Sequence, residues 1–439
     1  MLEVRTAGIC RGVMGESVLT AGFSRVAGTL RCEGVSLDAI ADAVDTPSYV
    51  YSAATIRNRY ELLAETLAGV SHRIHYTLKA NSNHALLSLL RELGAGVDVV
   101  SGGELYRAQR AGFAGADIIF GGVGKTEREL REAIEANVLL INVESEREVH
   151  LLDRIAGELG KIAPVSVRVN PEITVDAAHK YIRTGEKGHK FGVPFDDAVH
   201  VAEQAAALPN LALVGLDMHL GSQLSRVDPF RAGTERLASI ASDLRRGGVD
   251  TLKYLDIGGG LGVRYDSEDP PDLRRFAESV LPLVEATGLQ LIMEPGRFIV
   301  GNAAVLLTRV LYRKHSGGKN YVITDAGMTE LLRPSHYGAF HRIEAAQARP
   351  ERTRADVVGP VCESGDFLAL DREIEDVQPG DLLVVYDVGA YGSVMASTYN
   401  SRPRAAEVLV DGDRFAVITA RERYEDLVAR EVLEPSWRS

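Results

Sequence analysis

Residues 127–169, ERELREAIEANVLLINVESEREVHLLDRIAGELGKIAPVSVRV, carry the clearest signal for the fold. Two short apolar runs within it, 138–143 and 164–169, are rich in Val, Ile and Leu, as buried strands are. The charged segments 127–136 and 145–159 place Leu and Ile on one face of a helix. Helices that alternate with buried strands are typical of a parallel sheet. This stretch therefore predicts an α/β fold.

The same alternation continues on both sides. Six further apolar runs are predicted to be strands, at 73–78, 97–100, 117–120, 211–218, 254–257 and 289–293. Eight strands alternating with helices fit a (β/α)8 TIM-like barrel. A doubly wound sheet is the alternative, but it needs a glycine-rich phosphate turn after its first strand, where this chain reads KANSNH. We therefore predict a barrel over residues 53–300.

The pattern changes after residue 300. Strand-like runs occur at 304–312, 320–326, 356–361, 381–388, 405–410 and 414–420. Turn signals such as SGGK, QPGD and DGD separate them, with little helical pattern between. Residues 301–439 are therefore predicted to form an all-β domain, which residues 23–52 join, while 1–22 form an N-terminal extension.

Composition excludes several classes of protein. The 439 residues are 45% hydrophobic and 25% charged, which is typical of a globular protein. The net charge of −12, without a Lys/Arg block, disfavours a nucleic-acid partner or an anionic membrane surface. Cys10, Cys32 and Cys362 are too few and too scattered for a disulfide framework or a Cys-type zinc site, so no metal is expected. With no signal peptide and no run of about 20 apolar residues, the expected location is cytoplasmic.

Candidate catalytic residues follow the predicted strands, because barrel enzymes use the carboxyl ends of their strands. Lys79 directly follows the first strand. An isolated lysine is usually a solvated surface residue, but desolvation at a barrel mouth would lower its pKa and make its amine a nucleophile. His219 and Ser222 follow the sixth strand in MHLGSQ.

The last two strands of the barrel end in groups suited to an anion and an acid. Gly258, Gly259 and Gly260 in DIGGGLG offer backbone N–H groups to a phosphate. In EPGR, Glu294 could hold a proton on a heterocyclic nitrogen and Arg297 could bind an anion, although a surface ion pair is the simpler alternative. An amine, phosphate donors and an acid together fit pyridoxal phosphate.

Ten short motifs then identify a family resemblance. They are, in chain order, YTLKANSN, GVDVVSGGEL, HKYIRTGEKGHKFGV, HLGSQ, DIGGGLG, EPGR, TDAGM, LLRPSHY, CESGD and GAYGSVMASTYNSRPRAAEV. From about residue 24 to 421 the chain resembles the fold-type III pyridoxal-phosphate decarboxylases, and within them the diaminopimelate decarboxylase family. Phe298, where a small residue is common, and Thr398, where Asn is usual, depart from the pattern.

The resemblance implies a carboxy-lyase that uses pyridoxal 5'-phosphate to convert meso-2,6-diaminopimelate to L-lysine and CO2, the last step of lysine biosynthesis. Lys79 would bind the cofactor covalently, His219 would stack on its ring, and Glu294 would pair with the ring nitrogen. The residues implied to hold the phosphate are Ser222, Gly258, Gly259, Gly260 and the backbone of Glu294, Pro295, Gly296 and Arg297.

The resemblance also implies how the substrate is bound. Arg297, Arg333 and Tyr337 would bind its far carboxylate, and Tyr391 would contact both cofactor and substrate. Glu363 would bind its ammonium group and Cys362 would supply a proton, both from the second subunit of a homodimer. The structural alternative for Cys362 is a buried packing residue, and for Arg333 a surface charge.

Other activities remain open at this stage. A sister enzyme could decarboxylate ornithine, lysine, a carboxylated polyamine or a carrier-bound amino acid, and a racemase would use the same cofactor. A catalytically inactive relative that acts as a binding partner should have lost Lys79 or Cys362, and this chain keeps both.

Overall fold

The eight predicted barrel strands are confirmed in a computed structural model, which describes residues 22–175 and 185–437. They are β5 (His72–Thr77), β6 (Gly96–Val99), β7 (Ile118–Phe120), β8 (Leu140–Val143), β9 (Ala163–Asn170), β11 (Leu211–Asp217), β12 (Tyr254–Asp256) and β13 (Gln290–Met293). Each pairs in parallel with its neighbours, and the pairings of β13 with β5 and of β8 with β9 close the barrel. A short strand, β10 (Val193–Pro194), also pairs with β9.

Two stretches named in the sequence analysis lie outside the described residues. The predicted extension 1–22 does so except for Gly22, and Cys10 lies within it. The first six residues of HKYIRTGEKGHKFGV do so as well.

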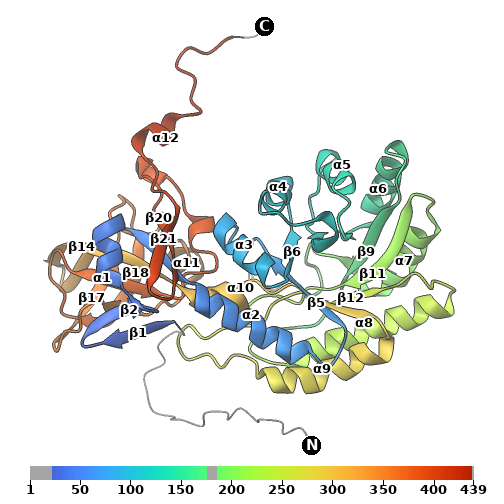
Figure 1. Cartoon of the computed structure of the whole chain (residues 1–439), viewed down its shortest axis with the longest axis horizontal. Coiled ribbons are helices and arrows are strands. Elements are labelled where there is room, and N and C mark those ends of the chain that lie inside the picture. The colour runs from blue at the N-terminus through green and yellow to red at the C-terminus, as the bar shows by residue number, and fades with distance from the viewer. Residues whose placement is uncertain (1–21, 176–184, 438–439) are drawn as a thin grey trace, which may run out of the picture.

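Helices surround the barrel (Figure 1). They are α2 (Ala53–Leu67), α3 (His84–Glu92), α4 (Gly102–Arg110), α5 (Glu127–Glu135), α6 (Glu146–Glu158), α7 (Ala198–Ala207), α8 (Asp228–Arg246) and α9 (Leu273–Thr287). Helix α5 shows why such a charged sequence is helical: Thr126 and Glu129 form a capping box, while Leu130 and Ile134 are buried against the barrel. Charged residues thus occupy the solvent face and the helix start.

The C-terminal strands form a second sheet beside the barrel. They are β14 (Ala304–Ser316), β15 (Lys319–Thr324), β16 (Ile343–Ala345), β17 (Arg352–Val358), β18 (Phe367–Glu375), β19 (Leu382–Tyr386), β20 (Ala406–Asp411) and β21 (Arg414–Thr419). Strand β18 was not predicted, because four of its nine residues, FLALDREIE, are charged and obscure the apolar pattern. Short helices α10 (Arg297–Val300), α11 (Arg333–Tyr337) and α12 (Tyr424–Val428) complete this half.

The N-terminal segment joins the second sheet, as predicted. Strand β4 (Ser48–Ser52) lies between β14 and β20, antiparallel to the first and parallel to the second. Ahead of it, β1 (Phe23–Val26), β2 (Thr29–Cys32) and β3 (Val35–Ser36) form a small sheet, followed by α1 (Leu37–Val44). Phe23 and Leu30 pack in one apolar cluster with Tyr386 of β19. The barrel is therefore inserted in the chain between β4 and its neighbours.

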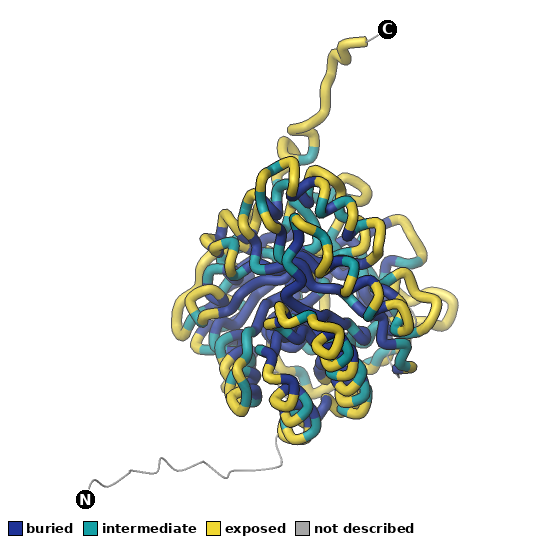
Figure 2. Tube along the Cα trace, turned by 90° about the vertical axis from the view of Figure 1, so that its right-hand side faces the viewer, coloured by how far each residue is buried: buried dark blue, intermediate teal, exposed yellow. Residues whose placement is uncertain are grey.

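Burial follows this arrangement. The strands at the centre are buried, and exposed residues lie on the outer helices and loops (Figure 2). No helix within residues 22–175 and 185–437 is both long and apolar enough to cross a bilayer. The carboxyl ends of the barrel strands open toward the second sheet, and the main cavity lies there.

Candidate active site

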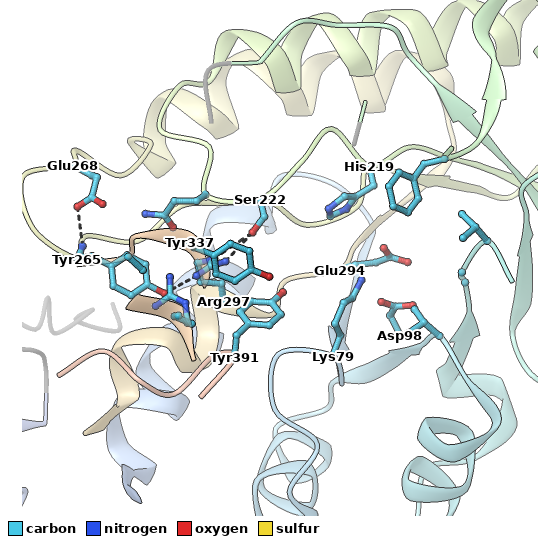
Figure 3. A pocket seen from close by; sticks show the side chains of 18 of the residues that line it. Lys79, Asp98, His219, Ser222, Tyr265, Glu268, Glu294, Arg297, Tyr337 and Tyr391 are labelled. Carbon is cyan, nitrogen blue, oxygen red and sulfur yellow. Dashed lines mark hydrogen bonds between the residues drawn. The ribbon is translucent and has the colours of Figure 1, made fainter. Parts of the chain in front are cut away.

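A cavity of about 700 Å3 lies at the carboxyl ends of the barrel strands, with one wall from the C-terminal half (Figure 3). The cavity and a recess beside it are lined by most of the predicted site residues, namely Lys79, His219, Ser222, Gly260, Glu294, Pro295, Gly296, Arg297, Arg333, Tyr337 and Tyr391. Side chains more than 300 positions apart in the sequence thus meet in one place.

Lys79 lies in the turn after β5, and its amine points into the cavity (Figure 3). The turn is held from the C-terminal half, since the Tyr391 N–H donates to Ala80 O at 2.9 Å. Lys79 is accessible to the open cavity, and desolvation by the cavity walls lowers its pKa, but Asp98, Tyr391 and Glu294 outweigh this effect and the net pKa is raised. The prediction of a lowered pKa is therefore wrong for the protein alone, because Asp98 on β6 and Glu294 after β13 help to hold the amine in its charged form.

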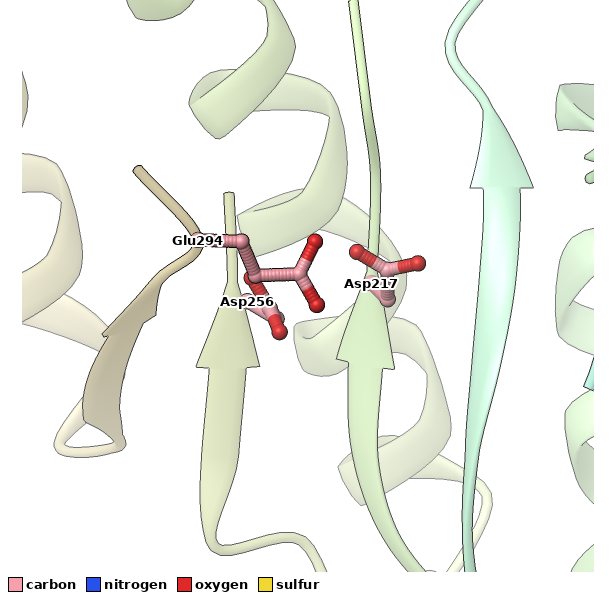
Figure 4. Close-up of side chains that lie close together, drawn as sticks. All are labelled: Asp217, Asp256 and Glu294. Carbon is pink, nitrogen blue, oxygen red and sulfur yellow. The ribbon is translucent and has the colours of Figure 1, made fainter. Parts of the chain in front are cut away.

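Three carboxylates form the floor of the cavity. Asp217 and Asp256 end β11 and β12, Glu294 follows β13, and oxygen atoms of the three lie within 4.8 Å of one another (Figure 4). Burial and mutual repulsion raise the pKa of Asp217 and Glu294 well above the ordinary values, and burial raises that of Asp256 to about 7. The floor therefore retains protons near neutral pH.

Two further charged groups border the floor. Arg168 on β9 donates to Glu144 at 2.6 Å and lies 3.7 Å from Asp217. Asp98 on β6 accepts from the Thr77 hydroxyl. The sequence interpretation had not assigned Asp98, Arg168, Asp217 or Asp256 to the site. The available signal was a charged residue inside an apolar run, as in VDVV, VSVRV and LDM.

The glycine loop after β12 packs against the loops of both neighbouring strands. A side chain on Gly259 would collide with Glu294 O, and one on Gly260, which has φ +96°, with Gly221 O. The N–H of Gly258 donates to Asp256 at 2.8 Å and that of Gly259 to His219 Nδ1 at 3.3 Å. Of the three glycines, Gly260 lines the recess, which it shares with Ser222 and Arg297.

His219 faces the cavity between the glycine loop and Lys79 (Figure 3). Burial, with the nearby charges of Arg168 and Lys79, holds its pKa well below the ordinary value. The imidazole is therefore neutral and can lie flat against an aromatic ligand without adding charge.

The outer wall of the cavity is cationic. Arg297 donates to the Tyr265 hydroxyl at 2.6 Å and to the Ser222 hydroxyl at 3.2 Å, and its guanidinium lies 4.8 Å from the centre of the Tyr391 ring. Arg333 lies beside the ring of the same Tyr265. The surface-charge alternative for Arg333 is wrong, because only 6% of the residue is exposed.

Cys362 and Glu363 are not in this cavity. Both are exposed, on a loop whose shape is held by the buried Asp366. The Asp366 carboxylate accepts from Val361 N and from Met328 N, each at 2.6 Å. The buried-packing alternative for Cys362 is therefore wrong, and the loop presents both side chains to the outside of the chain.

Comparison with known proteins identifies the family. Residues 53–301 match the family described as pyridoxal-dependent decarboxylase, pyridoxal binding domain. Diaminopimelate decarboxylase of Aquifex aeolicus is 47% identical over 403 residues, which cover 91% of this chain and 95% of that protein. The chain belongs to the diaminopimelate decarboxylase family. The resemblance seen in the sequence is thus confirmed, and with it the class of carboxy-lyases that use pyridoxal phosphate.

Solved structures of this family share the whole fold. Diaminopimelate decarboxylase from Helicobacter pylori, complexed with L-lysine, has a TM-score of 0.86 at 41% identity and covers 90% of this chain and 98% of its own. The enzyme from M. jannaschii, in complex with L-lysine, has a TM-score of 0.90 at 33% identity, with coverages of 95% and 99%.

The described residues fit the cofactor of this family. Buried Glu294 Oε1 has no hydrogen-bond partner among the described residues, which suits an acid that must face a ring nitrogen. The recess beside Gly260 offers the Ser222 hydroxyl as a donor to a phosphate. Lys79 lines both the cavity and the recess, together with Glu294 and Ser222.

Proposed function

We propose that the protein converts meso-2,6-diaminopimelate to L-lysine and CO2 with pyridoxal 5'-phosphate, the last step of lysine biosynthesis. The observation that carries the proposal is the pair of buried cations, Arg297 and Arg333, in the wall of the cavity that holds Lys79. Their hydrogen-bond partners among the described residues are uncharged. A substrate with a second carboxylate would supply the missing negative charge.

The barrel residues are proposed to hold the cofactor. Lys79 would bind it covalently, and Glu294 would keep a proton at the ring nitrogen. His219 would stack on the ring, and Ser222, Gly258 to Gly260 and the backbone of residues 294–297 would hold the phosphate. When bound, the cofactor supplies an electron sink for the electron pair that departing CO2 leaves behind.

The wall residues are proposed to hold the substrate. Arg297, Arg333 and Tyr337 bind the far carboxylate, and Tyr391 lies where it can contact both substrate and cofactor. This leaves the α-carbon that loses CO2 near Lys79, where a proton must later be returned. Following the family resemblance, we propose that Cys362 of the partner subunit returns that proton and that Glu363 of the partner subunit binds the ammonium; both side chains are exposed on the surface of the chain.

The shared site requires a homodimer, which a mixing experiment tests. Lys79→Ala and Cys362→Ala proteins, each inactive alone, should regain about a quarter of wild-type activity when mixed. Half of the random dimers are mixed and each of these has one intact site. Absence of recovery, with subunit exchange shown independently by mass, would contradict the shared site.

The domain limits and the location are also proposals. We propose an extension at 1–22, a segment 23–52 that belongs to the β-domain, a cofactor-binding barrel at 53–300 and the β-domain proper at 301–439. The pairing of β4 with β14 and β20 supports this division. A role in amino-acid biosynthesis favours the cytoplasm.

The activity is tested with purified protein, pyridoxal phosphate and a panel of diamino acids. CO2 and amine products should form from meso-diaminopimelate, with kcat/KM about 10^4-fold above that for L-lysine or L-ornithine. Such selectivity is expected of a site whose buried polar groups would be left unpaired by the smaller substrates. Comparable kcat/KM values for ornithine and diaminopimelate would instead support a sister decarboxylase.

A further inference from the structure

One tyrosine contacts both arginines of the cavity wall. Tyr265 lies in the loop after β12 and is 7% exposed. Its hydroxyl accepts from Arg297 Nη1 at 2.6 Å, while the Arg333 guanidinium carbon lies 4.5 Å from the centre of its ring. Two guanidinium groups that repel each other are thus kept side by side by the oxygen and the π face of a single side chain.

The loop that carries Tyr265 is itself braced. The Glu268 carboxylate accepts from the backbone N–H of Tyr265 at 3.0 Å and of Asp266 at 2.7 Å (Figure 3). From the other side, Asn302 donates to Arg264 O at 3.0 Å. Tyr265 therefore has a defined backbone position against which both arginines rest.

A buried histidine holds the second arginine. His341 is fully buried, and its Nε2 lies 2.8 Å from Arg333 Nη1, while its Nδ1 lies 2.8 Å from Tyr386 O. A guanidinium has only donors, so Nε2 must accept, and Nδ1 must carry the hydrogen that it donates to the carbonyl. The two contacts together require the neutral imidazole in a single tautomer.

The neutrality of this acceptor matters for the charge of the wall. A carboxylate in the place of His341 would pair with Arg333 and cancel its charge, as acids do for Arg168 elsewhere in the cavity. Burial and the adjacent Arg333 hold the pKa of His341 well below the ordinary value, so it stays neutral at physiological pH. Arg333 thus donates one N–H to His341, and its positive charge is not neutralised by this contact and can interact with a ligand.

We infer that His341 and Tyr265 are positioning residues that aim Arg333 and Arg297 at the far carboxylate of the substrate. The inference rests on the proposed function and extends it. Recognition of a second carboxylate then depends on two uncharged side chains as well as on the arginines, and neither the motifs nor the residue types of the sequence had marked these two.

The test compares His341→Leu, which removes the acceptor, with His341→Gln, whose Oε1 can accept from Arg333 in place of Nε2. KM and kcat are measured with meso-diaminopimelate, and inhibition constants with two matched ligands. L-lysine keeps one carboxylate and cadaverine, the same chain without it, keeps none. His150→Leu, on the exposed face of α6, is the control.

For His341→Leu we expect KM and the inhibition constant of L-lysine to rise about 10- to 100-fold, as for loss of a hydrogen bond to a charged group. We expect kcat to change by less than about threefold, and cadaverine inhibition and the visible absorption of the cofactor to stay unchanged, because the contact is with Arg333 and not with the floor. His341→Gln should recover most of the loss.

Three results would overturn the inference. They are equal weakening of lysine and cadaverine binding, a glutamine variant as impaired as the leucine variant, and unchanged KM in His341→Leu. Failure of the proposed function is seen separately, as absence of CO2 release from meso-diaminopimelate by the unmutated enzyme.

If His341→Leu does not yield folded protein, Tyr265→Phe makes the same comparison. It removes the hydroxyl that accepts from Arg297 and keeps the ring beside Arg333. The inhibition constant of L-lysine should then rise about 3- to 10-fold, the effect of one hydrogen bond, with cadaverine unaffected. No change for L-lysine would overturn the role of Tyr265.

Discussion

The floor of the cavity is built from acidic side chains and the outer wall from arginines. The two sets of side chains differ in whether burial can remove their charge. The floor gathers Asp217, Asp256 and Glu294, whose pKa values burial raises, so these acids lower their mutual repulsion by retaining protons. Arg297 and Arg333 in the wall have no such outlet, since a guanidinium does not deprotonate in proteins. The floor can therefore adjust to its ligand, whereas the wall stays positive and requires an anion.

The largest expected effect comes from removing Lys79, which lines the cavity. Lys79→Ala should lower kcat by about 10^4-fold or more, as loss of a covalent catalytic group does, and should abolish the visible absorption of the bound cofactor. Lys253→Ala, an exposed lysine ahead of β12, is the control. Borohydride labelling of a different lysine in the unmutated protein would show that the assignment is wrong.

The next effect tests whether the floor must supply an acid. Glu294→Gln keeps the shape but cannot transfer a proton, so kcat should fall about 10^2- to 10^4-fold, the usual contribution of a positioned acid or base. Cofactor binding, followed by absorption and by mass, should persist because Lys79 remains. An unchanged kcat would mean that the proton at the ring nitrogen does not depend on this carboxyl.

Removing an arginine from the outer wall should weaken the use of the substrate and leave the cofactor bound. Arg333→Ala should lower kcat/KM for meso-diaminopimelate by about 2–5 kcal/mol in activation free energy, as for truncation of one partner of a buried charge pair. The absorption spectrum should change little. Arg354→Ala, in an exposed ion pair on β17, serves as the control. Loss of cofactor from the Arg333 variant would contradict the separation of the two halves.

The smallest effect concerns stability and pH. The pKa of Asp256 is about 7 in the folded protein and about 4 in an unfolded chain, so folding keeps a proton that the unfolded chain releases. This carboxyl therefore destabilises the fold increasingly as pH rises from about 4 to 7, by at most about 1.4 kcal/mol per pH unit. Asp256→Asn removes the effect, so the Tm of the cofactor-free variant should gain on wild type across that window. Parallel Tm curves would show that Asp256 ionises normally.

The sequence predicted the barrel better than it predicted the cavity. Alternating apolar runs located all eight barrel strands, because burial on both faces leaves a local signature in each strand. Lys79, Glu294 and Arg297 could be proposed because they follow strands directly. His341 and Tyr265 could not, since both lie in loops. Tyr265 contacts Arg297 and Arg333, which follow it 32 and 68 positions later in the chain, and His341 is held by Tyr386, 45 positions later. Asp217 and Asp256 each lie at the end of an apolar run, and this position is a local signal for a residue of the active site.

The place of β4 in the second sheet has a consequence for biosynthesis on the ribosome. β4 emerges early, but its neighbour β14 follows roughly 250 residues later and β20 roughly 350 residues later. At 5–20 residues per second, β4 waits about 12 to 50 seconds for its first partner. During that time its backbone edges are open to other chains, while the strands of the barrel are being translated. The nascent chain must therefore protect one edge of an apolar strand until β14 has been translated, and the other edge until β20 has been.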